Sequence, residues 1–202
     1  MMKVYKEKKI SKLVIGVDEV GRGTLAGPVL SAAVILPFDF NINQLNDSKK
    51  LSKIQREKVF KIIKKHCNYK IGIADVNEID KYNILEATFL SMKRAINKFP
   101  CVKNYKIIVD GPFSFDKKNK NIVPIVKGDT KFPSIAAASI VAKVHRDKLM
   151  TNLSKKFTNY FWEKNAGYGT SQHLQAIQNY GVTIHHRKSF SPIGKILKPK
   201  AI

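Results

Sequence analysis

The chain has 202 residues, of which 37 are Lys or Arg and 15 are Asp or Glu, so its formal net charge is +22 at pH 7. This length suits one domain, or one domain with a small lobe, and the positive charge favours a polyanionic partner such as nucleic acid. The longest apolar run, 29–36, is too short to cross a bilayer and the charged first residues do not fit a signal peptide, so we expect no membrane association.

The cysteine content indicates the cellular compartment, and the overall composition offers a second explanation for the excess of lysine. Cys67 and Cys101 form neither a CxxC pair nor a zinc-binding spacing. Reduced thiols in a cytoplasmic protein are therefore expected. The chain is rich in Lys, Ile and Asn throughout, so the lysine excess is either functional or a background of composition.

The first part of the chain predicts two strands and a helix. The apolar runs 12–18 and 28–36 are typical of buried strands, and the glycines between them allow a tight connection. A helix is predicted over 47–66, where Ser52 and Gln55 form a capping box. The apolar residues on one face of this helix are Val59, Ile62 and Ile63.

The middle of the chain adds a strand and a second helix. Residues 69–75 alternate between two faces and predict a half-buried strand. The residues expected on its apolar face are Tyr69, Ile71 and Ile73. Apolar residues at helical spacing predict a helix over 83–99, with Asn83 as its cap.

The second half contains two short strands and two helices. The strands are predicted at 106–110 and 121–129, and Pro124 favours an edge position for the latter. The helices are predicted over 134–157 and 171–181. Their expected end residues are the caps Ser134 and Ser171 and the terminating Gly181.

This order of elements predicts an α/β fold. Strands that come first and then mix with helices form layers around one sheet. We expect residues 1–150 to form the core domain. Because the remainder is mostly helical, we expect 151–202 to form a C-terminal cap and tail.

Acids follow three of the apolar runs, namely Asp18 with Glu19, then Asp110, then Asp129. Sites in open α/β sheets gather beyond strand ends, and clustered carboxylates repel one another unless a cation neutralises them. Oxygen ligands without neighbouring His or Cys favour Mg²⁺ or Mn²⁺, and two such ions are a common arrangement for phosphodiester cleavage. Alternatively, each acid is a solvated turn residue, an interpretation that suits Asp110 before Gly111.

A glycine-rich stretch follows the first pair of acids. Gly21, Arg22 and Gly23 offer unobstructed backbone groups that can approach a sugar or phosphate, and Arg22 adds a guanidinium fork. A tight strand-to-strand turn is the alternative. Tyr168, between two glycines, either stacks on a sugar or base or packs on the cap.

The helix predicted over 134–157 carries polar residues on one face: Ser139, Lys143, Arg146 and Asp147. This face either contacts phosphates, with Asp147 as an alternative acid, or is an ordinary solvated face. The same two interpretations apply to Lys49, Lys50, Arg187 and Lys188. A nucleophilic Ser139–Lys143 dyad is disfavoured because no oxyanion loop or third member is evident.

Several segments, in this order and spacing, resemble the ribonuclease HII family. They are GVDEVGRGTLAGP (16–28), DSKKLS (47–52), NILEAT (83–88), IVDG (108–111), VKGD (126–129), AAASIVAKVHRD (136–147), GYGT (167–170) and HHRKSFSP (185–192). The GRG sequence after the acids favours type HII over the related type HIII. Thr24 stands where many members of the family carry proline.

The resemblance implies an RNase H-like fold, with a mixed five-stranded sheet flanked by helices and a small helical C-terminal cap. It implies an endonuclease that cleaves the RNA strand of RNA–DNA hybrids and incises duplex DNA 5′ to single embedded ribonucleotides, as in ribonucleotide repair. The products would carry 3′-hydroxyl and 5′-phosphate ends. Two divalent ions, Mn²⁺ or Mg²⁺, would be held by four acids: Asp18, Glu19, Asp110 and Asp129.

The resemblance also assigns residues to the substrate. Gly21, Arg22 and Gly23 would sense the 2′-hydroxyl at the RNA–DNA junction, and Tyr168 would pack on the junction sugar. The other implied substrate residues are Lys49, Ser139 and Lys143. A monomer is expected by default. Two other functions remain open: a nuclease of the same fold with broader hybrid cleavage, and a non-catalytic basic protein that binds nucleic acid.

Overall fold

The computed structural model describes residues 7, 10–11, 13–45 and 51–197. Five strands form one sheet in the order β3-β2-β1-β4-β5. They are β1 (Val14–Val20), β2 (Val29–Ile35), β3 (Asn68–Ala74), β4 (Lys106–Asp110) and β5 (Ile122–Ile125). β2 runs antiparallel to both β1 and β3, whereas β4 is parallel to both β1 and β5. The mixed five-stranded sheet implied by the sequence is confirmed, and β5 is an edge strand as Pro124 predicted.

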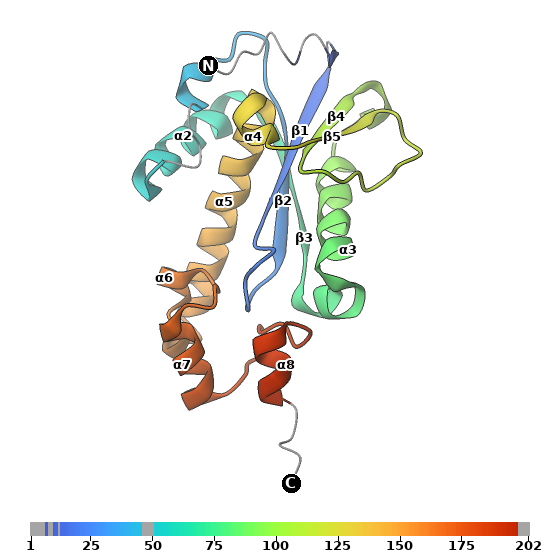
Figure 1. Ribbon diagram of the computed structural model, residues 1–202. Coiled ribbons are helices and arrows are strands. Elements are labelled where there is room, and N and C mark those ends of the chain that lie inside the picture. The colour runs from blue at the N-terminus through green and yellow to red at the C-terminus, as the bar shows by residue number, and fades with distance from the viewer. Residues whose placement is uncertain (1–6, 8–9, 12, 46–50, 198–202) are drawn as a thin grey trace.

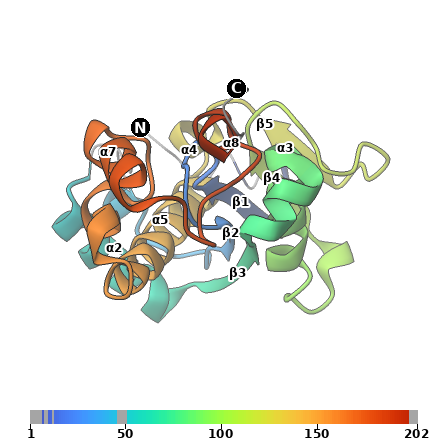
Figure 2. The same ribbon diagram turned by 90° about the horizontal axis from the view of Figure 1, so that it is seen from below.

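Helices cover both faces of this sheet (Figures 1 and 2). They are α2 (Lys53–His66), α3 (Val76–Ile96), α4 (Gly128–Lys131), α5 (Pro133–Ser154), α6 (Trp162–Asn165), α7 (Ser171–Tyr180) and α8 (Ser191–Leu197). α5 packs against β1 and β2 on one face of the sheet, where α2 also packs against α5. α3 packs against β3 and β2 on the other face. No helix in the described part of the chain is both long and apolar enough to cross a membrane.

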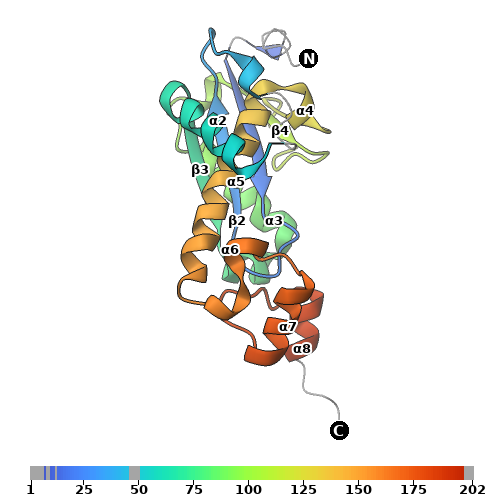
Figure 3. The ribbon, with the colours of Figure 1, turned by 90° about the vertical axis from the view of Figure 1, so that its left-hand side faces the viewer.

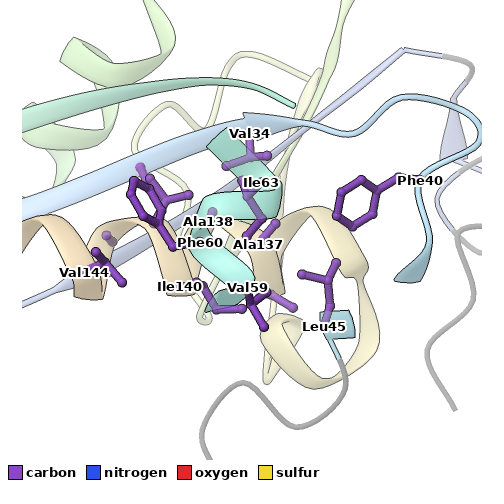
Figure 4. Close-up of a cluster of buried hydrophobic side chains, with 14 of the residues drawn as sticks. Val34, Phe40, Leu45, Val59, Phe60, Ile63, Ala137, Ala138, Ile140 and Val144 are labelled. Atoms are coloured by element: carbon purple, nitrogen blue, oxygen red, sulfur yellow. The ribbon is translucent and has the colours of Figure 1, made fainter. Parts of the chain in front are cut away.

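The cluster of buried side chains between α2, α5 and β2 forms one part of the core (Figure 4). The predicted face of α2 supplies Val59 and Ile63, together with Phe60, whereas Ile62 is only partly buried. The alanine-rich start of α5 lets this helix approach the sheet closely. The capping box is present: Ser52 is the N-cap, α2 begins at Lys53, and Gln55 is the third residue of the helix.

The expected apolar face of β3 is confirmed for Tyr69 and Ile71, which are partly buried against the core cluster, and is wrong for Ile73. Gly72 and Ala74 are buried, whereas Ile73 is 39% exposed. A Cβ on Gly72 would lie 1.9 Å from the Ser91 carbonyl oxygen in α3. Small residues therefore mark the face where the helix comes closest, and the larger apolar side chains lie on the opposite face.

Helix starts differ from the predictions by short distances. Pro133, not Ser134, is the first residue of α5, because proline is well suited to the first helical position. Thr170, not Ser171, caps α7, and its hydroxyl accepts the His173 N–H at 3.3 Å. Gly181 ends α7 as predicted.

The helix α3 is longer than predicted and is interrupted. Asn83 has φ 71° inside it, and its side-chain oxygen accepts the N–H groups of Leu85 and Glu86. The predicted cap is therefore confirmed for the second part of the helix. The first part, capped by Asp75 with Glu78, was not predicted.

The C-terminal helices α6, α7 and α8 gather at one end of the molecule (Figure 3). Their shared apolar cluster includes Trp162, Ile177 and Ile193, and also Leu25 and Met150 from the rest of the chain. α5 continues to Ser154, through the expected boundary at 150. The division into a core of 1–150 and a cap of 151–202 stays a prediction.

Candidate active site

Asp18 and Asp110 lie side by side near the carboxyl-terminal ends of the neighbouring strands β1 and β4. Val17 of β1 pairs with Val109 of the parallel strand β4, so the acids that follow occupy neighbouring positions. Adjacent strands are about 4.8 Å apart, which brings the two carboxyl groups within strong electrostatic range. Glu19 comes next in β1, and Asp18 itself is buried.

The segment before α5 contains Asp129 and contacts Asp110. The Gly128 N–H donates to Asp110 Oδ1 at 2.6 Å. A Cβ on Gly128 would lie 2.6 Å from Ile135 Cδ1, so a side chain at this position would displace the end of Ile135. Asp129 follows in the first turn of α4 and is buried. Asp18 and Asp110 are thus brought together from distant parts of the sequence, and Asp129 follows the glycine that is bonded to Asp110.

Burial and mutual repulsion disfavour the charged forms of Asp18 and Glu19. Burial raises the pKa of Asp18 well above its usual value, and the charges of Glu19 and Asp110 raise it further, whereas a hydrogen bond from the Ser139 hydroxyl lowers it. Burial also raises the pKa of Glu19, although Arg22 Nη1, 3.2 Å from Glu19 Oε1, opposes this. A bound cation would relieve the repulsion.

The donor set fits a hard divalent cation. All candidate ligands are carboxylate oxygens, which Mg²⁺ and Mn²⁺ prefer. Within the described ranges, no three Asp, Glu, His or Cys side chains are grouped so that they could hold a metal ion by themselves. Mg²⁺ is usually bound through only one or two carboxylates, with waters and substrate phosphates as its other ligands.

Two buried arginines hold the glycine loop, residues 21–28. Burial lowers the pKa of Arg146 to about 10 and that of Arg187 to about 9, so both remain charged at neutral pH. Arg146 donates to the carbonyls of Pro28, Ala26 and Ala166 and to Thr24 Oγ1. Arg187 donates to the carbonyls of Gly21, Arg22 and Gly27.

The hypothesis that Arg146 and Arg187 contact phosphates is therefore wrong. Both side chains are fully buried and their N–H groups are used by backbone carbonyls. Arg146 does share a helical face with Ser139 and Lys143, but the glycine loop covers that face at its position. Lys188 is exposed, so for this residue both interpretations stay open.

Gly23 has no structural reason to lack a side chain. A Cβ at this position would meet no atom within 4 Å, and its φ is not in the left-handed region. Gly21 differs, because its φ is +91° and a Cβ would lie 2.2 Å from Arg146 Nε. The open space at Gly23 is therefore available to a ligand that approaches the backbone.

Tyr168 shares a cavity with Glu19, and its segment is bonded to the glycine loop. Its side chain lines a cavity of about 310 Å³, and the residue is 43% exposed. The other lining residues are Glu19, Val20, Arg56, Ser139, Ile140 and Lys143. The Gly167 carbonyl accepts the Leu25 N–H at 2.8 Å, which ties the tyrosine segment to the glycine loop. The structure thus brings Tyr168, Ser139 and Lys143 to the same cavity.

The family model described as "Ribonuclease HII" matches residues 15–192, which is most of the chain. The chain belongs to the ribonuclease HII family. It is accordingly a nuclease of the ribonuclease H class, a hydrolase that acts on RNA–DNA hybrids, and dependence on a metal ion is general in this family. The resemblance to ribonuclease HII is confirmed.

Individual relatives agree with this assignment. Ribonuclease HII of Pelagibacter ubique is 52% identical over 186 residues, which cover 92% of this chain and all of the relative. The crystal structure of ribonuclease H2 from Pyrococcus horikoshii superposes with a TM-score of 0.72 at 27% identity, over 91% of this chain and 96% of the other. Bst-RNase HIII in complex with Mn²⁺ has the same fold, with a TM-score of 0.71 at 19% identity, over 91% of this chain and 68% of the other.

Asp147 pairs with two basic side chains that line the cavity of this ribonuclease HII site. Its Oδ1 accepts from Lys143 Nζ at 2.7 Å, and its Oδ2 lies 3.9 Å from Arg56 Nη1. Asp129, next to the glycine that contacts Asp110, is the better candidate for the fourth acid. The engagement of Lys143 with Asp147 also argues against a Ser139–Lys143 dyad.

Sequence reasoning missed Arg56 as a site residue and gave Arg146 and Arg187 the wrong role. Arg56 lines the tyrosine cavity, yet in the sequence it is one of many basic residues in a helix. The roles of Arg146 and Arg187 in holding the loop depend on contacts across more than 100 positions. Lys49, the remaining predicted substrate residue, lies outside the described residues.

Proposed function

We propose that this ribonuclease HII incises duplex DNA on the 5′ side of a single embedded ribonucleotide. It also cleaves the RNA strand of RNA–DNA hybrids and leaves 3′-hydroxyl and 5′-phosphate ends. The observation that carries this proposal is the position of the acids directly beside a glycine loop whose backbone is fixed by Arg146 and Arg187. Hydrolytic groups and a rigid recognition element therefore share one site.

Recognition of ribose follows from the glycine loop. The 2′-hydroxyl distinguishes RNA from DNA, and backbone groups near Gly21, Arg22 and Gly23 are proposed to bind it. The open space at Gly23 allows a sugar to approach the chain closely. A site built for a hydroxyl partner rejects deoxyribose because its own polar groups are then left unpaired.

Asp18, Glu19, Asp110 and Asp129 are proposed to hold two divalent ions, Mg²⁺ or Mn²⁺. When bound, such ions supply an activated water and stabilise the leaving oxygen of the phosphodiester. The protein supplies the oxygen donors and their orientation. The Gly128 N–H fixes the Asp110 carboxylate, and the Ser139 hydroxyl supports Asp18.

The substrate is proposed to lie along the tyrosine cavity. Tyr168 would pack on the sugar at the junction, because an exposed aromatic ring next to the acids can stack on the substrate. Lys143 and Ser139 line the same cavity and would contact the backbone of the cleaved strand. Arg22, whose side chain is 44% exposed, would offer its guanidinium to a phosphate.

The decisive experiment uses three end-labelled duplexes incubated with Mg²⁺ or with Mn²⁺. One contains a single internal ribonucleotide, one is a continuous RNA–DNA hybrid and one is all DNA. We expect one incision 5′ to the ribonucleotide, cleavage of the hybrid and no cleavage of the DNA. Cleavage of the hybrid alone would instead identify the broader hybrid nuclease. Salt-dependent binding without any cleavage would identify a non-catalytic binding protein.

A monomer in the cytoplasm is the proposed working form. The acids, the glycine loop and Tyr168 all come from one chain, so no second copy is needed to complete the site. Cys67 and Cys101 are free thiols, which fits a reducing compartment. Sedimentation equilibrium at catalytic concentrations should give the mass of one chain.

A further inference from the structure

A buried polar network lies directly beneath Tyr168. His173 and His186 are both fully buried, and their Nε2 atoms are 3.2 Å apart. Trp162 Nε1 donates to His173 Nε2 at 3.0 Å, and His173 Nδ1 lies 2.8 Å from the Tyr168 carbonyl oxygen. The aromatic ring of Tyr160 packs against this group. None of these histidines belongs to the acid cluster.

The hydrogen-bond partners define the direction of the network. His186 Nδ1 accepts the Thr183 N–H at 2.9 Å, so the proton of the neutral ring is on Nε2. The Tyr168 carbonyl can only accept, so His173 carries its proton on Nδ1. His173 Nε2 is then the acceptor for both Trp162 and His186. The N–H groups of the two histidines therefore point in one direction, from His186 to His173 and from His173 to the Tyr168 carbonyl.

This network fixes the backbone of the tyrosine at its carbonyl group. The Tyr168 oxygen accepts both the Thr170 N–H, at 2.8 Å, and the His173 Nδ1–H. A packed apolar residue at position 173 would fill the space but would give no directional restraint. Fully satisfied buried networks specify one geometry, which is what a recognition residue needs.

We propose that His173 is a positioning residue that holds Tyr168 at the substrate cavity through the bond to its carbonyl oxygen. This inference rests on the proposed role of Tyr168 at the junction sugar. His173 does not touch the substrate. It keeps the tyrosine ring in a fixed position relative to Glu19 and Ser139, which line the same cavity. Trp162 and His186 in turn hold His173 in the required tautomer.

Two variants separate the roles of the two ring nitrogens. His173→Asn keeps an N–H donor near the position of Nδ1, whereas His173→Gln keeps an acceptor near Nε2 and loses the donor to Tyr168. On the single-ribonucleotide duplex we expect His173→Gln to lower kcat/KM by roughly ten- to a hundredfold, because small misplacements in a site have costs of this size. We expect His173→Asn to recover most of this loss.

A double-mutant cycle distinguishes positioning from general destabilisation. If His173 acts through the tyrosine, His173→Gln should have almost no further effect on kcat/KM in a Tyr168→Ala background. Trp162 is the only tryptophan in the chain and donates to His173, so its fluorescence reports whether the network is still folded. The emission of His173→Gln should match that of the unmodified enzyme.

The possible failures are distinguishable. If the unmodified enzyme does not cut the single-ribonucleotide duplex, the proposed function fails before His173 is tested. If it cuts but the effects of His173→Gln and Tyr168→Ala multiply, the positioning role is overturned. The same conclusion holds if His173→Asn and His173→Gln lose activity only in proportion to their melting temperatures.

Discussion

Arg187 donates a hydrogen bond to the carbonyl of Gly21, a residue 166 positions earlier in the chain. The same guanidinium also binds the carbonyls of Arg22 and Gly27 at 2.8 to 3.0 Å. The segment after the C-terminal helix α7 is thus joined to the loop proposed to recognise ribose. We therefore expect a change in the packing around Arg187 to alter the glycine loop.

Arg187→Lys should destabilise the protein although it keeps the charge. Lysine lacks the planar fork that serves three carbonyl groups, and buried hydrogen bonds to charged groups contribute about 1.5–3 kcal/mol each. We expect a loss of about 2 kcal/mol or more in the free energy of unfolding, measured with urea. Lys188→Ala, at the exposed neighbouring position, should leave this value nearly unchanged. Equal stability of Arg187→Lys and the unmodified enzyme would contradict the role of the fork.

Thr24→Val should weaken the glycine loop from within. The Thr24 hydroxyl is buried, donates to the Gly21 carbonyl at 3.1 Å and accepts from Arg146 Nη2 at 2.9 Å. Valine has a similar shape, so the loss of two hydrogen bonds should lower the free energy of unfolding by about 1–3 kcal/mol. Thr158→Val, at an exposed position, is the matched control. Thermal melts that coincide for both variants would count against the bonding role of Thr24.

Asp18→Asn and Asp110→Asn should abolish cleavage while the duplex still binds. A metal-binding readout separates this from indirect damage, because an ion that binds only the folded state raises the melting temperature. Mg²⁺ or Mn²⁺ should stabilise the unmodified enzyme and the exposed-loop variant Asp116→Asn, and should not stabilise the two site variants. Wild-type cleavage rates in both site variants would refute the metal assignment.

Tyr168→Ala should strongly reduce the rate on the single-ribonucleotide duplex. Stacking of an aromatic side chain on a base contributes about 1–3 kcal/mol, and a similar contribution from packing on the sugar gives an expected loss on the order of ten- to a hundredfold. Tyr168→Phe keeps the ring and should keep most of the activity. Tyr180→Ala removes another exposed tyrosine of the same cap and serves as the control. An unchanged rate for Tyr168→Ala would remove its proposed role.

Stability should fall as the pH drops from about 6.5 toward 4. Burial lowers the pKa of His186 from 6.5 to about 4, and the nearby His173 and His185 add to this. The unfolded state then binds more protons than the folded state in this window, so acid favours unfolding, by on the order of 3 kcal/mol for His186. Urea unfolding at a series of pH values measures this loss.

A non-titrating variant provides the control for this pH dependence. His186→Asn keeps an acceptor for the Thr183 N–H but binds no proton, so the slope between pH 6.5 and 4 should be smaller. His66→Gln, at an exposed position, should keep the full slope. Identical slopes for His186→Asn and the unmodified enzyme would show that other groups cause the acid sensitivity.

Much of the fold was predictable because its signals are local. The five strands follow from short apolar runs, and the capping box of Ser52 and Gln55 places the start of α2. Asp18 and Asp110 both follow apolar runs, and sites gather beyond strand ends, so their meeting was also predicted. That β1 and β4 are parallel neighbours is known only from the structure. The predicted features depend on residues close together in the sequence.

The sequence by itself determined the order of the elements, the acids and the glycine stretch. Only the tertiary structure decided that Ile73 faces solvent while Gly72 faces α3, and that Arg146 and Arg187 turn inward to the glycine loop. A buried arginine and a surface arginine look alike in a sequence. An arginine side chain becomes buried only where backbone carbonyls from a distant segment replace the water around its guanidinium. Those carbonyls reach it only when the chain has folded.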